Sequence, residues 1–214
     1  MRLFKKILNT AVADLRKYDE KALNKYKMIN AATVILPENP TPEFMQAYSS
    51  INVNCAKTMY YSDSKQIYST NGVGYYDDSS LSDDVLYFLN GIDVINSVDK
   101  IPEICVNGIV ILSNNAKVKI QSINGMNVKC YFDIEHYKCY TSDFYVDKDF
   151  VEYVDDNTVI LSSGKLTFDA DINSDILKNK QILFVSSGDI ISSKDLMPIV
   201  KLKSYTAGKL KIND

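Results

Sequence analysis

The sequence predicts a mainly β protein that begins with an α-helix and continues as a β-solenoid with repeated units of about 17–25 residues. Three observations lead to this prediction. Apolar residues have helical spacing near the N-terminus, the rest of the chain consists of short runs rich in Val, Ile, Tyr and Thr, and Asn-Gly recurs at a fixed interval. The solenoid is either a β-helix or a leucine-rich-like horseshoe. An antiparallel β meander or sandwich is the alternative, because Asn-Gly between alternating stretches is also a hairpin signal.

Residues 1–28 form the predicted amphipathic helix. Apolar residues recur every three to four positions from Leu3 to Tyr26. This segment has eight basic and three acidic residues, whereas the whole chain has a net charge of −3. We expect the helix to cap one end of the solenoid, because an open end would expose apolar surface and strand edges. Residues 29–214 form the second predicted unit, a single repetitive β-rich domain.

Short helices are expected to interrupt this β-rich domain. Residues 41–49 start with Thr41 as a cap and Pro42 at the first helical position. Residues 82–90 begin with the cap sequence Ser-Asp-Asp and end before Gly91. Residues 147–154 and 193–200 are further helix candidates.

The internal repeat is the most informative feature of the sequence. The form apolar-Asn-Gly-apolar-x-apolar begins at Leu89, Val106 and Ile123, at successive offsets of 17 residues. Asn-Gly tolerates a positive φ, so each copy predicts a sharp corner followed by a strand. Looser copies of the corner occur at glycines 72, 164, 188 and 208. A meander gives no reason for a constant interval, and the solenoid is therefore preferred.

Bulk composition limits the classes of function. With 46% hydrophobic residues the chain can form a core, and its net charge of −3 argues against binding nucleic acid through the phosphate backbone. The longest apolar runs are far shorter than the ~20 residues of a spanning helix, so no integral membrane segment is expected. The basic N-terminal residues are not followed by a secretory cleavage site, which favours a cytoplasmic location. The four cysteines contain no C-x-x-C pair and are expected to be buried free thiols: Cys55, Cys105, Cys130 and Cys139.

Two groups of residues resemble metal sites without completing one. Cys130 and His136 would lie on one face of a strand, with Asp133 and Cys139 on the other, so the four do not converge. The run from Asp169 to Asp175 opens like a calcium loop but has serine at the sixth position and lysine at the twelfth. We expect no metal and no cofactor.

Tyrosines and paired acids supply the candidate binding residues. Fifteen tyrosines occur without any tryptophan, and an exposed tyrosine ladder can stack on sugars or anchor a protein partner. Two acids on one strand face can bind glycans or do general acid and base work when burial separates their pKa values. The candidates are Tyr131, Tyr137 and Tyr140 together with the pairs Asp133/Glu135 and Asp169/Asp171.

No catalytic constellation is evident, so a non-enzymatic role is favoured over an enzymatic one. The first hypothesis is a repeat module that presents a surface to a protein partner or serves as a structural scaffold. The second is a carbohydrate-binding or carbohydrate-cleaving solenoid that uses the paired carboxylates. The third is a self-assembling structural element, for which a closed dimer is more plausible than a filament because lysines blunt the last strand.

Overall fold

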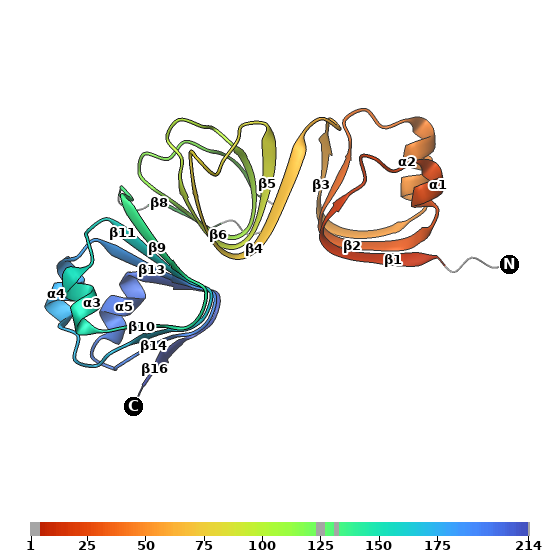
Figure 1. Cartoon of the computed structure of the whole chain (residues 1–214). Helices are drawn as coiled ribbons and strands as arrows, with labels where there is room; N and C mark the ends of the chain where they lie inside the picture. The colour runs from red at the N-terminus through yellow and green to blue at the C-terminus, as the bar shows by residue number, and fades with distance from the viewer. Residues whose placement is uncertain (1–4, 123–126, 131–132, 214) are drawn as a thin grey trace.

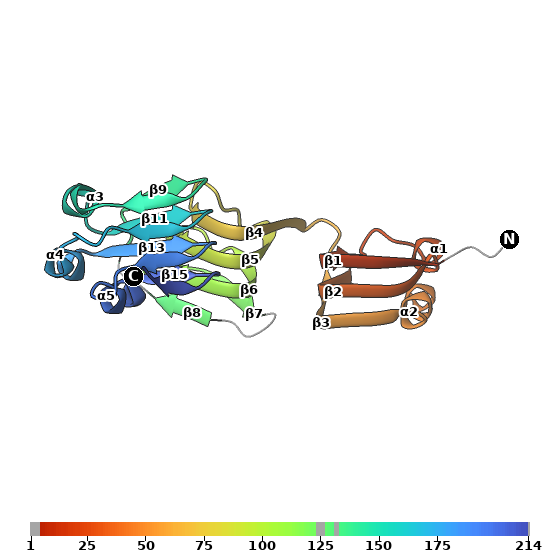
Figure 2. The ribbon, with the colours of Figure 1, turned by 90° about the horizontal axis from the view of Figure 1, so that it is seen from below.

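The structure is a computed structural model that describes residues 5–122, 127–130 and 133–213. It is mainly β: these residues form sixteen strands and five short helices, and the strand pairs they contain are parallel. The strands form three separate stacks, which lie side by side along an arc (Figure 1). The first strand of each stack, β1, β4 or β9, lies on the same side of the molecule (Figure 2). We call this the first-strand end.

The first stack is a three-stranded sheet with two helices on its return segments. Its hydrogen-bonded register skips Ala11, Ala32 and Ala56, so a small residue stands at the same level in each strand. Next to this interruption, the Asn30 side chain donates to Asn9 and accepts from Asn54, which holds the strands in register. The elements are β1 (Lys6–Asp14), α1 (Glu20–Leu23), β2 (Tyr26–Pro37), α2 (Pro42–Ser49) and β3 (Asn52–Tyr61).

The middle stack contains the Asn-Gly corners. Gly72, Gly91 and Gly108 lie in register on neighbouring strands, and all three have positive φ. A Cβ at Gly91 would lie 1.9 Å from the carbonyl oxygen of Gly72, so the close approach of the two corners requires glycine. The strands are β4 (Gln66–Asp77), β5 (Val85–Asn96), β6 (Glu103–Leu112), β7 (Lys119–Ser122) and β8 (Asn127–Cys130).

The third stack has two sheets joined by corners and closed by three helices. Ser162 and Ser186 stabilise successive corners, because each hydroxyl donates to a backbone carbonyl of the preceding coil. One sheet contains β9 (His136–Tyr140), β11 (Thr158–Ser162), β13 (Ile182–Ser186) and β15 (Ser204–Thr206); the other contains β10 (Phe144–Val146), β12 (Leu166–Phe168), β14 (Ile190–Ser192) and β16 (Leu210–Ile212). The helices are α3 (Lys148–Tyr153), α4 (Ser174–Asn179) and α5 (Met197–Leu202).

Apolar contacts between sheet faces join the stacks. Ile35 and Met59 of the first stack pack against Phe88 of the middle stack. On the other side, Val94 of the middle stack packs against Val159 of the third. β5 is therefore buried on both faces, which explains its nearly continuous apolar sequence.

The structure corrects the predicted fold class. Parallel sheets of three to five strands, with no hydrogen-bonded register from one stack to the next among the described residues, do not form one continuous β-solenoid. The antiparallel meander is also wrong, since the strand pairs are parallel.

The predicted N-terminal helix is also wrong. Residues 6–14 form strand β1, and helix α1 has four residues. The strand register is interrupted at Ala11, and Leu8 packs into the core of the first stack whereas Val12 packs against the middle stack. Two apolar residues four positions apart therefore serve two different cores, although the same spacing is typical of one face of a helix. The division of the chain at residue 28 stays a prediction.

Among the shorter predicted helices, 41–49 is confirmed as α2, with Thr41 accepting from the Phe44 amide. The segment 82–90 instead leads into β5.

Candidate binding site

Strand β4 is an edge strand at the first-strand end of the middle stack. It pairs with β5 on one side, and the sheet ends there among the described residues. It is twelve residues long, and most of its side chains are exposed or half-buried. An edge strand presents N–H and C=O groups that another strand can bind.

β4 also lacks the charges that usually protect such an edge. From Gln66 to Tyr76 the strand has no charged residue. Among the other edge strands longer than three residues whose lysine side chains the structure describes, each contains a lysine that blunts pairing with a further strand: Lys6, Lys57, Lys119 and Lys138.

The corner of β4 is open on its outer side. A Cβ at Gly72 would meet no atom within 4 Å, whereas one at Gly108 would lie 2.0 Å from the carbonyl oxygen of Gly91. The space in which a preceding corner would place its carbonyl is therefore empty beside Gly72. The outer side of this corner is therefore open at Gly72.

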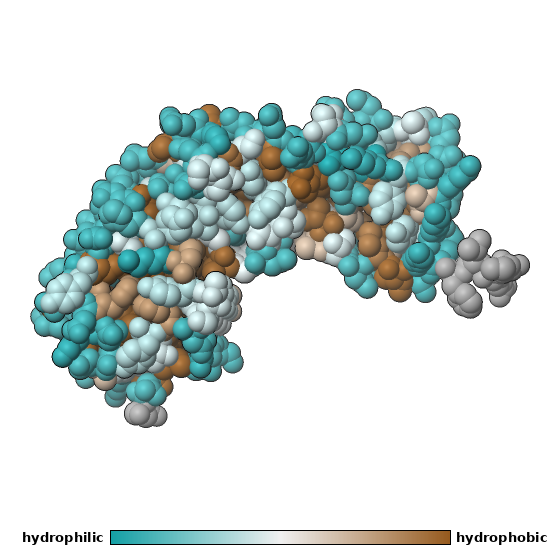
Figure 3. All heavy atoms as spheres, viewed as in Figure 1, coloured by the Kyte–Doolittle hydropathy of each residue, from teal (hydrophilic) through white to brown (hydrophobic). Residues whose placement is uncertain are grey.

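Four tyrosines surround a cavity of about 430 Å³ at the exposed end of the middle stack. The rings of Tyr68 and Tyr87 meet edge to face at 5.7 Å, and those of Tyr76 and Tyr87 lie 6.5 Å apart at 60°. Figure 3, which views the molecule from the first-strand end, shows a pale, weakly polar surface over the middle stack between the brown apolar groups. The tyrosine pocket, as we call it, is lined by Gln66, Ile67, Tyr68, Tyr75, Tyr76, Ser80, Val85 and Tyr87.

A buried carboxyl group lies behind one wall of the tyrosine pocket. Asp93 is 2% exposed, and the Tyr76 hydroxyl donates a hydrogen bond to it. Within the described part of the chain, its Oδ2 has no hydrogen-bond partner. Burial raises the pKa of Asp93 to about 7, and burial together with the neighbouring Asp93 charge raises the pKa of Tyr76. Gly74 leaves room for this pair, since a Cβ there would lie within 3 Å of both side chains.

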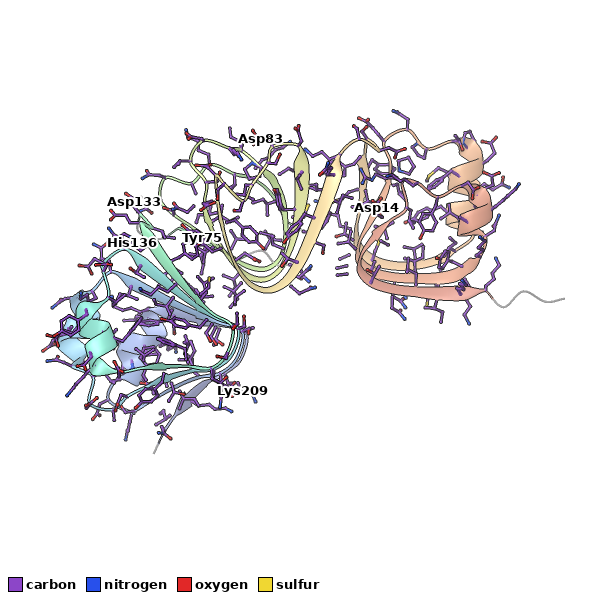
Figure 4. All side chains as sticks on the ribbon, in the orientation of Figure 1. Asp14, Tyr75, Asp83, Asp133, His136 and Lys209 are labelled. Carbon is purple, nitrogen blue, oxygen red and sulfur yellow. The ribbon has the colours of Figure 1, made fainter. Side chains whose placement is uncertain are left out.

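The predicted tyrosines have different environments. Tyr137 on β9 is half exposed and stacks on Tyr75 at 4.0 Å, so it extends the aromatic surface of the tyrosine pocket into the third stack. Figure 4 shows Tyr75 on the side of the middle stack that faces Asp133 and His136. Tyr140 instead stacks on Phe144 and packs against the core of the third stack. Tyr131 lies outside the described residues.

The two predicted acid pairs lie on different elements. Glu135 accepts from the Asn157 side chain beside a cavity of about 300 Å³ lined by Glu135, His136, Tyr137, Lys138 and Asp155. Asp133 is exposed just before it. On the other sheet of the same stack, Asp169 accepts from the Tyr145 hydroxyl, which lowers its pKa, and Asp171 lies 3.9 Å from Lys148. These acids stay a prediction as binding residues.

A larger cavity of about 610 Å³ lies where the first and middle stacks meet, with Lys57, Tyr60 and Lys119 among its lining residues. Glu103 has two partners in this cavity: the Tyr61 hydroxyl donates to it at 2.6 Å, and Lys65 lies 3.5 Å from it. These contacts join the two stacks, so we assign this cavity a structural role.

Cys105 is buried, Cys55 is half-buried and Cys139 is exposed, each as a free thiol. No group of three or more His, Cys, Asp or Glu in the described residues is placed to hold a metal ion. The helices seen in these same ranges are too short or too polar to cross a membrane.

Comparison of the chain with protein-family models, curated proteins and solved structures gives no match.

Proposed function

We propose that the protein is a non-enzymatic binding module that pairs with an extended segment of a protein partner along β4. The observation that carries the proposal is the uncharged edge from Gln66 to Tyr76 beside the tyrosine pocket. Strand addition of this kind takes affinity from main-chain hydrogen bonds and specificity from pockets for alternate side chains.

The corner at Gly72 supports a partner that follows the bent edge. Gly91 and Gly108 each have the carbonyl of the preceding corner where a Cβ would lie. The same place beside Gly72 is open, so a partner's carbonyl can take it. A segment that bends opposite Gly72 would pair with both arms of β4, Gln66–Asn71 and Val73–Asp77. Residues on its inward face would then reach the tyrosine pocket.

The test uses a library of random twelve-residue peptides selected on the full chain. We expect selected peptides to slow hydrogen exchange of β4 amides and to lose binding at least tenfold in Ser69→Lys, because an added charge blunts an exposed strand edge. The matched control is Asn52→Lys, which adds the same charge at an exposed position on the edge strand β3.

Three outcomes would overturn the proposal. These are a selection that yields no peptide, peptides that bind Asn52→Lys and Ser69→Lys equally well, and peptides that leave β4 exchange unchanged. Light scattering adds a fourth: a dimer that Ser69→Lys dissociates would assign the edge to a second copy of the chain.

Glycan binding is the second candidate. The cavity at Glu135, His136 and Tyr137 combines an exposed ring with polar groups, which suits a sugar. In a glycan screen, a glycan that binds this cavity should raise the melting temperature of the wild type but not that of Tyr137→Ala. No shift with any glycan would reject this candidate.

A further inference from the structure

The tyrosine pocket is lined by aromatic rings, which are the groups that bind organic cations. Tyr68 and Tyr76 come from β4 and Tyr87 from β5, and their rings are steeply inclined to one another, so that they form walls of different orientation. The face of a tyrosine ring attracts an ammonium or guanidinium group. Among the described residues that line the pocket, there is no lysine or arginine that would already occupy these rings.

The surroundings of the tyrosine pocket are acidic. Residues 66–84 contain four aspartates and no basic residue. Hydrogen bonds from Ser79 and Ser80 lower the pKa of Asp77, and those from Ser97 and the amides of residues 98–100 lower the pKa of Asp78 to about 2, so both are ionised at neutral pH.

The two lysines beside this acidic loop have partners. Lys65 lies 3.5 Å from Glu103 and donates to the Asp83 carbonyl, and Lys100 donates to the Leu81 carbonyl. Both ammonium groups are therefore directed to these partners, and neither lysine lines the tyrosine pocket.

Asp93 adds a second, independent indication. Its carboxyl group is 2% exposed, has one oxygen without a hydrogen-bond partner among the described residues, and is connected to the wall of the pocket through the Tyr76 hydroxyl. When Asp93 is ionised, the hydrogen bond from the Tyr76 phenol to its carboxylate polarises the phenol and makes the ring more electron-rich. This strengthens attraction of a cation to that ring.

We propose that the tyrosine pocket binds the ammonium or guanidinium group of a lysine or arginine side chain. This rests on the proposed function, because the lysine or arginine side chain belongs to the extended partner segment that pairs with β4.

The experiment titrates small analogues of these side chains into the full chain labelled with ¹³C-tyrosine. n-Butylammonium and n-propylguanidinium are the probes, and 1-butanol is the neutral control. We expect saturable shifts of the Tyr68, Tyr76 and Tyr87 ring signals with both cations, and at least tenfold weaker binding of 1-butanol. Equal affinity for 1-butanol, or no saturable shift with either cation, would overturn the proposal.

Variants identify the rings. Tyr68→Leu should lose cation binding and Tyr68→Phe should retain it, because the ring face and not the hydroxyl attracts the cation. Tyr60→Leu is the matched control, since Tyr60 and Tyr68 are both 50% exposed and Tyr60 lies on the first stack. Undiminished cation binding to Tyr68→Leu would contradict the assignment.

The two proposals fail separately. If the cations bind but selected peptides leave β4 unprotected, strand addition is wrong and the cation site stands. If peptides pair with β4 yet share no basic residue and the cations do not bind, the cation site is wrong and strand addition stands.

Discussion

The ring of Tyr137 lies parallel to the ring of Tyr75, with centroids 4.0 Å apart and planes 15° apart. The two residues belong to β9 and β4, the first strands of the third and middle stacks. Beneath them, Ile92 and Val94 of the middle stack pack against Val159 of the third. The stacked pair thus closes the exposed end of an apolar joint between two stacks and at the same time extends the tyrosine pocket.

Removal of one ring from this pair should weaken the joint. Tyr137→Ala is expected to lower the free energy of unfolding by about 1 kcal/mol, because the stacked contact and its buried area are lost. Tyr153→Ala is the control, since Tyr153 is 77% exposed, and it should cost less than about 0.5 kcal/mol. Urea unfolding followed by circular dichroism measures both values, and equal losses would contradict the role of the pair.

The corner glycines should differ in their tolerance of alanine. Gly72→Ala meets open space and carries the strain of a φ of +103°, at a cost of about 1–3 kcal/mol. Gly91→Ala adds a collision with the Gly72 carbonyl and should cost more than about 4 kcal/mol or prevent folding. Thermal unfolding of the two variants compares them. Similar melting temperatures would mean that the corners are not packed as described.

The buried Asp93 should make stability depend on pH. Its pKa is about 7 in the folded protein against 3.8 in an exposed group, so folding takes up a proton between these values. This contribution to the free energy of unfolding is fully present below about pH 4, falls by about 1.4 kcal/mol per pH unit up to pH 7, and is constant above it.

Asp93→Asn removes that titration. The difference in unfolding free energy between variant and wild type should therefore move in favour of the variant from pH 5 to pH 8, as measured by urea unfolding at each pH. A difference that is constant over this range would show that Asp93 ionises normally.

Arg16 should be needed to hold the first stack to the turn before β4. It is 7% exposed, pairs with Asp14 at 2.9 Å, and donates to the carbonyls of Ser62 and Lys65. Arg16→Met should cost about 2–4 kcal/mol, because it leaves these carbonyl acceptors and the Asp14 carboxylate without their donor. Lys17→Met, at the exposed neighbouring position, should change stability by less than about 0.5 kcal/mol in the same urea experiment.

The candidate site shows how far sequence reasoning extends. The tyrosine-rich segments were evident, and Tyr137 was among the predicted residues. Asp93 was missed although it carried a signal, since a single acid stands between Ile92 and Val94 in an otherwise apolar strand. A charge in a strand buried on both faces must be neutralised or hydrogen-bonded, and this makes such a residue a candidate for function.

By itself the sequence determined where the middle and third stacks turn. Gly91 and Gly108 mark corners of the middle stack because positive φ and close backbone contact exclude other residues. Gly188 and Gly208 mark corners of the third stack because a Cβ there would lie within 3 Å of the preceding corner's backbone. It did not mark the corners of the first stack, where Ala11 stands in their place and gives no turn signal.

Only the tertiary structure decided that the chain forms three stacks and which strand is left as an open edge. Phe88 and Val94 are equally apolar in sequence whether they face the inside of a coil or a neighbouring sheet. Burial is favourable in either place, so hydrophobicity alone does not distinguish them. The packing of whole sheet faces makes that choice, and with it leaves β4 unpaired beside the tyrosine pocket.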